Sequence, residues 1–133
     1  MKRFISVLLL AALLGGCASM EERKKTVTLV SATRHYEGAI RWGDYETANA
    51  FRFQQDAGDT TPDPENLKRF RVTSYETLST VLNEDDTEAQ IMVQIRYYDE
   101  ERMKEVTLTD RQTWKYDAEL VQWFLYSPLP DFR

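Results

Sequence analysis

Histidine and cysteine are almost missing from this 133-residue chain, which contains one of each, His35 and Cys17. A single cysteine allows no intramolecular disulfide, so the fold must be stable without a covalent cross-link. A zinc site needs several converging histidine, cysteine or carboxylate ligands, and one histidine with one cysteine does not supply them. We therefore expect no metal and no cofactor, and we interpret His35 as a partly exposed helix residue rather than a general base.

The sequence is also short of glycine, with five residues, and of positive charge, with a formal net charge of −5 at pH 7. It contains no glycine-rich phosphate loop. Its lysines and arginines are interspersed with acidic residues, as on a solvated surface. Because affinity for nucleic acid depends on clustered cations that neutralise phosphates, the composition argues against a nucleic-acid partner.

Long hydrophobic runs are limited to one, near the start of the chain. The basic residues Lys2 and Arg3 precede an apolar segment from Phe4 to Leu14. This segment has about the length of a signal-peptide core and is too short for a permanent membrane-spanning helix. Charged residues follow in the segment 21–25. The order predicts a signal peptide over residues 1–16.

The segment Leu14-Gly15-Gly16-Cys17 resembles the lipobox of bacterial lipoproteins. The resemblance implies cleavage between Gly16 and Cys17 and the attachment of acyl chains to the Cys17 thiol and the new amino group. Each buried methylene contributes about 0.8 kcal/mol, so two or three chains would anchor the protein stably. The absence of an aspartate after Cys17 resembles sorting to the outer membrane of Gram-negative bacteria, on its periplasmic face. The alternatives are a signal peptide with an incidental cysteine and a buried thiol in a cytosolic domain.

Cleavage would leave residues 17–133, enough for one domain with a modest core, and would make the net charge more negative. In this interpretation residues 17–26 are the lipidated cysteine and a short tether, and residues 27–133 form a single domain. The spacing of apolar residues predicts a helix from about Val27 to Trp42. One face of this helix carries Leu29, Ala32, Tyr36, Ala39, Ile40 and Gly43.

Two shorter helices and a loop are predicted next. Asp44 suits the N-cap of a second helix that buries Tyr45 and Ala48, and Gly43 suits the stop of the first. The stretch 54–63 is a loop by composition. Asp63 followed by Pro64 is typical of the start of another short helix.

The second half of the chain alternates between apolar and polar residues, as strands with one buried face do. The residues predicted to point inward from four strands are Phe70, Val72, Leu78 and Leu82; Ala89, Ile91, Val93, Ile95 and Tyr97; Val106, Leu108, Trp114 and Tyr116; and Val121, Trp123 and Leu125. Glu76 interrupts the first alternation, which predicts a bulge or bend over residues 74–76. Pro128 and Pro130 end the sheet and leave a short tail. Helices followed by four meandering strands predict an α+β fold with helices on one face of an antiparallel sheet.

This order of elements resembles the NTF2-like, or cystatin-like, α+β roll over residues 27–126. The segments 40–45, 112–114 and 121–125 add to the resemblance, and the segment from Trp123 to Pro130 is similar to the ends of a group of proteobacterial lipoproteins. The resemblance implies an interior that, in isomerases and dehydratases of the NTF2-like class, holds an acid or a histidine as base. This chain departs from that pattern because no Asp–His pair is readable.

The third predicted strand carries Asp110 and Gln112 toward the interior, between apolar neighbours. A lone carboxylate that faces an apolar interior is costly unless it is paired or wet. One explanation is a pocket in the roll, formed by Tyr36, Tyr97, Asp110, Gln112 and Trp114. The other is structural: Asp110 lies in solvent after a shift at a bulge, or it pairs with an arginine of a helix, namely Arg34, Arg41 or Arg52.

These observations favour a non-enzymatic envelope lipoprotein that contacts the membrane through lipid on Cys17. It would be an accessory or interaction module that binds a protein partner or forms a homodimer through its sheet. Met92, Tyr98 or Phe124 on the convex face would then belong to the partner surface. The alternatives are a binder of a small apolar ligand and a cofactor-free, isomerase-like enzyme, both using the interior of the roll.

Overall fold

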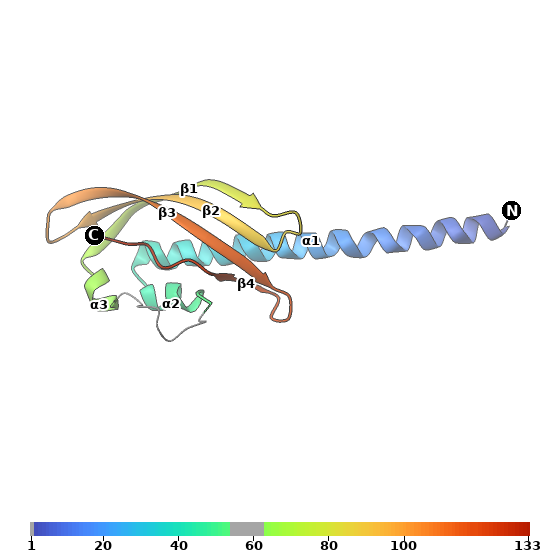
Figure 1. The fold of residues 1–133 in the computed structure, drawn as a ribbon, viewed down its shortest axis with the longest axis horizontal. Coiled ribbons are helices and arrows are strands. Elements are labelled where there is room, and N and C mark those ends of the chain that lie inside the picture. The colour runs from blue at the N-terminus through green and yellow to red at the C-terminus, as the bar shows by residue number, and fades with distance from the viewer. Residues whose placement is uncertain (1, 54–62) are drawn as a thin grey trace.

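In a computed structural model, a long helix lies along one face of a four-stranded antiparallel sheet (Figure 1). The structure describes residues 2–53 and 63–133, and for residues 2–16 and Pro64 it describes the backbone alone. Most of the predicted loop over 54–63 therefore lies outside the described residues. The predicted α+β fold, a helix on an antiparallel meander, is confirmed.

The helices are α1 (Lys2–Trp42), α2 (Tyr45–Ala50) and α3 (Pro64–Leu67). The strands are β1 (Phe70–Leu82), β2 (Glu88–Asp99), β3 (Lys104–Asp117) and β4 (Gln122–Leu125). Each strand pairs antiparallel with the next one in the chain, so the order across the open sheet is β1-β2-β3-β4. A parallel bridge between Arg52 and Leu125 adds the segment after α2 to the outer edge of β4.

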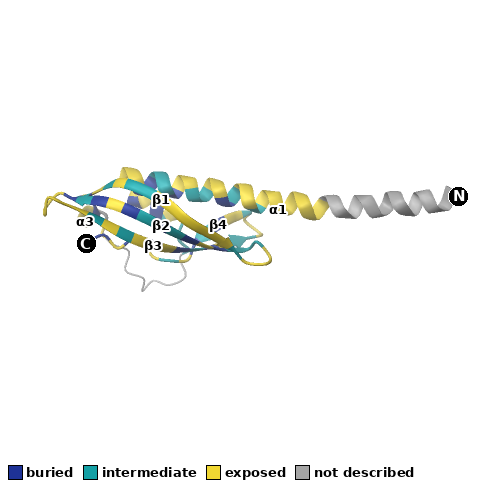
Figure 2. Ribbon diagram, turned by 90° about the horizontal axis from the view of Figure 1, so that it is seen from above, coloured by how far each residue is buried: buried dark blue, intermediate teal, exposed yellow. Residues whose placement is uncertain are grey.

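α1 begins much earlier than the predicted start near Val27, because residues 17–26 are helical instead of an extended tether. The segment 21–25 consists of glutamate, arginine and lysine, which are good helix formers, so the helix continues through it. Residues 17–24 of α1 project beyond the sheet and are exposed (Figure 2). In the described part of the chain, no helix combines the length and the apolar character needed to cross a membrane.

The ends of the helices follow their predicted signals. Gly43 stops α1 with φ of 70°, in the left-handed region where glycine carries no penalty. The Asp44 side chain caps α2 by accepting a hydrogen bond from the Thr47 backbone N–H at 3.1 Å. Asp63 caps α3 in the same way, from the backbone N–H of Glu65 at 3.0 Å.

β2 and β3 keep the predicted alternation along their full length. The predicted inward residues of β2, from Ala89 to Tyr97, are all buried. Across the β2–β3 ladder Val93 lies opposite Asp110, and Ala89 lies opposite Trp114. This register places Asp110 and Gln112 on the face of the sheet that α1 covers.

β1 departs from the prediction because its register shifts twice, between Val72 and Ser74 and between Thr77 and Ser79. The first shift lies beside the predicted bulge, and the sequence pattern did not predict the second. Between the two shifts the opposite set of side chains points inward, so Tyr75 packs against the core. Leu78, predicted to be inside, is 49% exposed, and that prediction is wrong because the second shift displaces it from the inner face.

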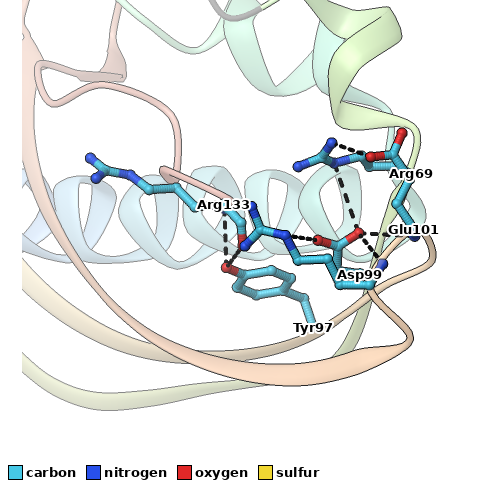
Figure 3. A network of polar contacts seen from close by, with 6 residues as sticks. Arg69, Tyr97, Asp99, Glu101 and Arg133 are labelled. Carbon is cyan, nitrogen blue, oxygen red and sulfur yellow. Dashed lines mark hydrogen bonds and ion pairs between the residues drawn. The ribbon is translucent and has the colours of Figure 1, made fainter.

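The chain after β3 is also different from its prediction at both ends. Val121 was predicted to open the fourth strand but lies in the preceding turn with φ of 55°. The proline-containing tail folds back under the body and buries Leu129 and Phe132. The Phe132 ring lies 4.8 Å from the Tyr97 ring, and the Tyr97 hydroxyl donates to the Arg133 carbonyl at 2.9 Å (Figure 3). The tail is thus part of the core.

Candidate functional site

Cys17, the predicted lipidation site, is free and exposed on the projecting half of α1. Its neighbours Ala18, Ser19 and Met20 are exposed as well. The side chains of the signal-peptide segment 1–16, including the predicted cleavage residue Gly16, lie outside the described part of the chain. The geometry at Cys17 is that of a thiol that a modifying enzyme can approach from solvent.

The interior residues of β3 form a chain of hydrogen bonds. The Trp114 indole N–H donates to the Gln112 side-chain carbonyl at 3.0 Å. The Gln112 amide group donates in turn to the Asp110 carboxylate at 2.8 Å and to the Tyr75 hydroxyl oxygen at 2.9 Å. We call Asp110, Gln112, Trp114 and Tyr75 the interior polar cluster. These bonds use the carbonyl oxygen and the two N–H donors of the Gln112 side-chain amide.

Tyr36 of α1 covers the interior polar cluster. Its ring meets the Trp114 ring edge-on at 5.4 Å, and it meets the Phe51 ring at 6.1 Å. Tyr36 is fully buried, and its hydroxyl has no hydrogen-bond partner among the described residues. A buried hydroxyl without a partner costs free energy, so this atom stands out in an otherwise well-packed interior.

The electrostatics of the cluster follow from burial. Burial raises the pKa of Asp110, against a smaller lowering by the Gln112 hydrogen bond. Burial also raises the pKa of Tyr36 and of Tyr75, and in both cases the negative charge of Asp110 adds to the rise. The Gln112 amide group is bonded to both the Asp110 carboxylate and the Tyr75 hydroxyl, which places that phenol near the carboxylate.

Neither structural explanation for Asp110 agrees with this geometry. Asp110 is only 8% exposed, so it does not lie in solvent. No ion pair between described residues includes it, and Arg41 instead pairs with Glu37 at 3.6 Å. Arg34 is exposed at the surface of α1, and Arg52 donates to the Asn49 side chain at 3.5 Å. The expected pairing of Asp110 with Arg34, Arg41 or Arg52 is therefore wrong.

Four of the five residues predicted to form a pocket come together: Tyr36, Asp110, Gln112 and Trp114. Tyr97 lies apart from them, on the part of β2 that packs against Phe70 and Phe132. Close to it, Asp99 holds the β2–β3 turn by accepting from the backbone N–H groups of Glu101 and Arg102 at 3.0 and 3.4 Å (Figure 3). Tyr97 and Asp99 thus belong to a structural region at the other end of the sheet.

The sequence pattern missed Tyr75, which supplies a hydroxyl to the cluster from β1. A signal for it was present, because Glu76 breaks the alternation of β1 and a break of that kind turns the neighbouring side chain inward. The pattern alone could not show on which side of the break the alternation resumes.

Three of the hollows in the described part of the chain border α1, and two of them lie along residues 28–37. A cavity of about 200 Å³ lies between α1 and β1, and we call it the α1–β1 cavity; it is lined by Val30, Thr33, Arg34, Glu37, Tyr75, Thr77, Thr80, Ile91 and Gln112. A groove of about 460 Å³ lies between α1, α2 and β4, and its lining includes His35, Phe51, Trp123 and Phe124. His35 is exposed, in agreement with its interpretation as a surface helix residue.

The convex face does not carry the expected row of exposed apolar residues. Met92, Tyr98 and Phe124 are each half-buried. The Tyr98 hydroxyl contacts the Met103 sulfur at 3.2 Å, and the Phe124 ring packs edge-on against Phe53 at 5.7 Å. Each of the three side chains keeps part of its area exposed, so a partner surface made of them stays a prediction.

In the described part of the chain no three histidine, cysteine, aspartate or glutamate side chains are grouped to hold a metal ion. No family model, curated protein or solved structure matches this chain, so its function must be argued from the motif at Cys17 and from the geometry of its own residues.

Proposed function

We propose that this chain is a lipoprotein of a Gram-negative envelope, in which acylated Cys17 holds a non-enzymatic α+β body at the periplasmic face of the outer membrane. The observation that carries the proposal is the combination of the Leu14-Gly15-Gly16-Cys17 motif with an exposed thiol on a projecting helix. A cysteine buried in the core, as a cytosolic structural thiol would be, could not be acylated without unfolding.

The shape of α1 supports this role. Residues 17–24 are exposed on all sides of the helix, so the sheet does not obstruct Cys17. The same helix continues into the body, where Leu29, Tyr36 and Ile40 are buried. Acyl chains on Cys17 would therefore be connected to the folded body through a continuous helix, with no flexible segment between them.

The anchor is tested on the native product from a Gram-negative host that carries the lipoprotein-processing enzymes. Mass spectrometry of the amino-terminal peptide should show a chain that begins at Cys17 and carries the mass of two or three acyl chains. Density-gradient separation should place the protein with the outer membrane, and a Cys17→Ser variant should leave it. An unmodified Cys17 behind an uncut leader would refute the proposal.

We assign the groove between α1, α2 and β4 to the interaction role. Its partly exposed aromatic lining residues Phe51 and Phe124 offer apolar area, and the neighbouring β3–β4 turn exposes 61% of Leu120. Exposed apolar area of this kind is typical of partner surfaces. A protein partner or a second copy of the chain would bury it.

A photo-crosslinking amino acid at position 122, in the groove, tests this assignment in intact cells. The matched control is the same amino acid at exposed position 111 on the outer face of β3. We expect an adduct at Gln122 only, dependent on Cys17, whose mass separates a homodimer from another partner. No adduct, or equal adducts at Gln122 and Arg111, would contradict the role of the groove.

A further inference from the structure

A third hollow lies where α1 ends, on the far side of the body from Cys17, and we call it the α1-end hollow. The end of α1, the start of α2, the residue that caps α3 and the start of β1 line it. Its volume is about 370 Å³. That volume is within the range of sites that bind small molecules. The proposed interaction role does not use this hollow.

Every charged side chain in the lining of the α1-end hollow is positive. These side chains are Arg41, Lys68 and Arg71, and the lining includes no aspartate or glutamate. Such a group of cations contrasts with the rest of the chain, whose formal net charge is −5. Because no carboxylate of the wall opposes the three cations, the hollow should attract an anion.

Each of the three cations has one carboxylate partner outside the lining, and these partners do not block the hollow. The pairs are Arg41 with Glu37, Lys68 with Glu65 and Arg71 with Glu100. All six side chains are at least 34% exposed. Exposed ion pairs contribute little to stability, so a ligand carboxylate can share or replace these partners.

An apolar surface lies beside the cations. Trp42 is 89% exposed, and Val72 is half-buried. Tyr45 and Phe70 also line the hollow but are almost fully buried, so Trp42 and Val72 supply most of the apolar area that a ligand can cover. A ligand that covered the indole ring would remove a large apolar surface from water.

The end of α1 is compatible with an anion nearby. The last carbonyl groups of a helix carry partial negative charge, which by itself disfavours an anion. Two of these carbonyls accept hydrogen bonds within the chain, Ala39 from the Asp44 N–H at 2.9 Å and Ile40 from the Gly43 N–H at 3.2 Å. Arg41 adds a full positive charge in the same turn.

We propose that the α1-end hollow binds a small carboxylate with an apolar body. The carboxylate lies among Arg41, Lys68 and Arg71, and Trp42 covers the body. An aromatic carboxylate meets both requirements, because an arginine can pair with a carboxylate through two N–H groups and a flat ring can pack against an indole. The site goes beyond the proposed function and does not depend on the lipid anchor. It also lies outside the interior of the roll, where the sequence predicted an apolar ligand.

The test uses the purified full chain in a neutral detergent and follows two NMR signals of the hollow during titration. These signals are the Trp42 indole N–H and the Gly43 backbone N–H. The indoles of Trp114 and Trp123 are internal controls, because each donates a hydrogen bond within the body. Sodium benzoate is the probe. Benzyl alcohol has the ring without the charge, acetate has the charge without the ring, and benzylammonium has the opposite charge.

We expect benzoate to shift the Trp42 and Gly43 signals in a saturable way, and the three control compounds to bind more weakly or not at all. The affinity for benzoate should fall as sodium chloride rises from ~0.01 M to ~1 M, because the Debye length shortens from about 30 Å to about 3 Å. Three results would overturn the proposal: no saturable shift with benzoate, an equal affinity for any control compound, or shifts at Trp114 and Trp123 as large as those at Trp42.

Variants locate the carboxylate of the ligand, with the Gly43 signal as the readout. The double change Lys68→Gln and Arg71→Gln should weaken benzoate binding about tenfold. The matched control is Arg111→Gln, at an exposed arginine on the outer face of β3, and it should leave the affinity unchanged. Wild-type affinity in the double variant would overturn the placement of the carboxylate.

Two further variants make separate predictions for the charge and the apolar body. Glu100→Gln removes the carboxylate that competes for Arg71, so benzoate should bind about twofold more tightly, a gain that partial unfolding cannot produce. Trp42→Ala should weaken binding about fivefold, because the apolar body loses its cover. Weaker binding in Glu100→Gln, or unchanged binding in Trp42→Ala, would contradict the proposed arrangement.

Discussion

At the scale of single residues, Asp110 is a buried acidic side chain whose ionisation should lower the stability of the folded protein. Its carboxylate is buried, with one hydrogen bond, from Gln112, and no ion pair to a described cation. Residues of this kind are commonly kept at a cost to stability because a site needs them. Removing the charge of Asp110 should therefore change the free energy of unfolding.

Asp110→Asn should make the protein more stable at neutral pH. Burial raises the pKa of Asp110 in the folded state, so the folded protein binds this proton more tightly than the unfolded chain does. The resulting stabilisation is complete below the unfolded pKa of about 3.9 and is lost as the pH rises through the folded-state pKa. Asparagine is neutral throughout, so the variant should gain on the order of 1 kcal/mol in the free energy of unfolding at pH 7. Urea denaturation at pH 7 and pH 3.5 measures this gain, which should vanish at the lower pH.

Two tyrosine-to-phenylalanine variants compare the stability effect of a hydrogen-bonded hydroxyl, that of Tyr75, with that of a hydroxyl without a described partner, that of Tyr36. Tyr36→Phe removes a hydroxyl without a described partner, and the free energy of unfolding should stay the same or rise by up to about 1 kcal/mol. Tyr75→Phe leaves an N–H of the Gln112 amide unpaired in the interior and should cost about 1–2 kcal/mol. Equal effects in thermal or urea unfolding would contradict this description of the cluster.

The burial of a single side chain could be predicted where the alternating pattern of its strand is long and uninterrupted. Asp110 and Gln112 lie inside as predicted because β3 keeps an uninterrupted period of two, from Val106 to Tyr116. Tyr97 also lies inside, but a period of two does not tell where along a 12-residue strand a side chain will meet others. Distances between strands depend on register, which the sequence pattern does not contain.

At the scale of elements, β1 shows how a bulge defeats a local pattern. Its two register shifts reverse the inner face between Val72 and Ser79, so Leu78 is exposed although it shares the parity of Phe70. The C-terminal tail was a second part of the chain that the sequence pattern did not predict. Leu129 and Phe132 belong to no periodic pattern, so their burial follows from tertiary packing alone. By contrast, the caps at Asp44 and Asp63 were predictable, since each depends on neighbours within three residues.

Replacing each of two leucines with alanine tests which side chains of β1 and β4 are buried in the core. Leu78→Ala should change the free energy of unfolding by less than about 0.5 kcal/mol, because the side chain is half exposed and lies at a register shift. Leu125→Ala should cost about 2–4 kcal/mol, because that side chain is fully buried in β4. Chemical denaturation of both variants gives the comparison, and a large loss at Leu78 would mean that β1 is paired in another register.

At the scale of the whole molecule, α1 connects the thiol at Cys17 to the far end of the body. The sequence predicted two parts, a tether of about 30 Å when fully extended and a separate helix. In the structure one helix spans both, because nothing in the segment 18–26 interrupts it. At 1.5 Å per residue this segment is about 14 Å long, and Trp42 lies about 38 Å from Cys17 along the axis. A helical connection keeps a fixed distance that a flexible tether does not.

If the acyl chains of Cys17 lie in a bilayer, that distance should be measurable on the acylated protein in vesicles. A fluorophore is attached in turn at Met20→Cys and at Trp42→Cys, two positions that are 74% and 89% exposed in the structure. Lipids with spin-labelled headgroups should quench the fluorophore at position 20 strongly and the one at position 42 weakly, because α1 holds the second far from the bilayer. Replacing residues 21–25 with glycine and serine should raise the quenching at position 42, since a flexible tether lets the body approach the surface. Equal quenching at both positions without that replacement would show that the helix lies flat on the membrane or is broken there, and the continuous α1 would then not describe the anchored protein.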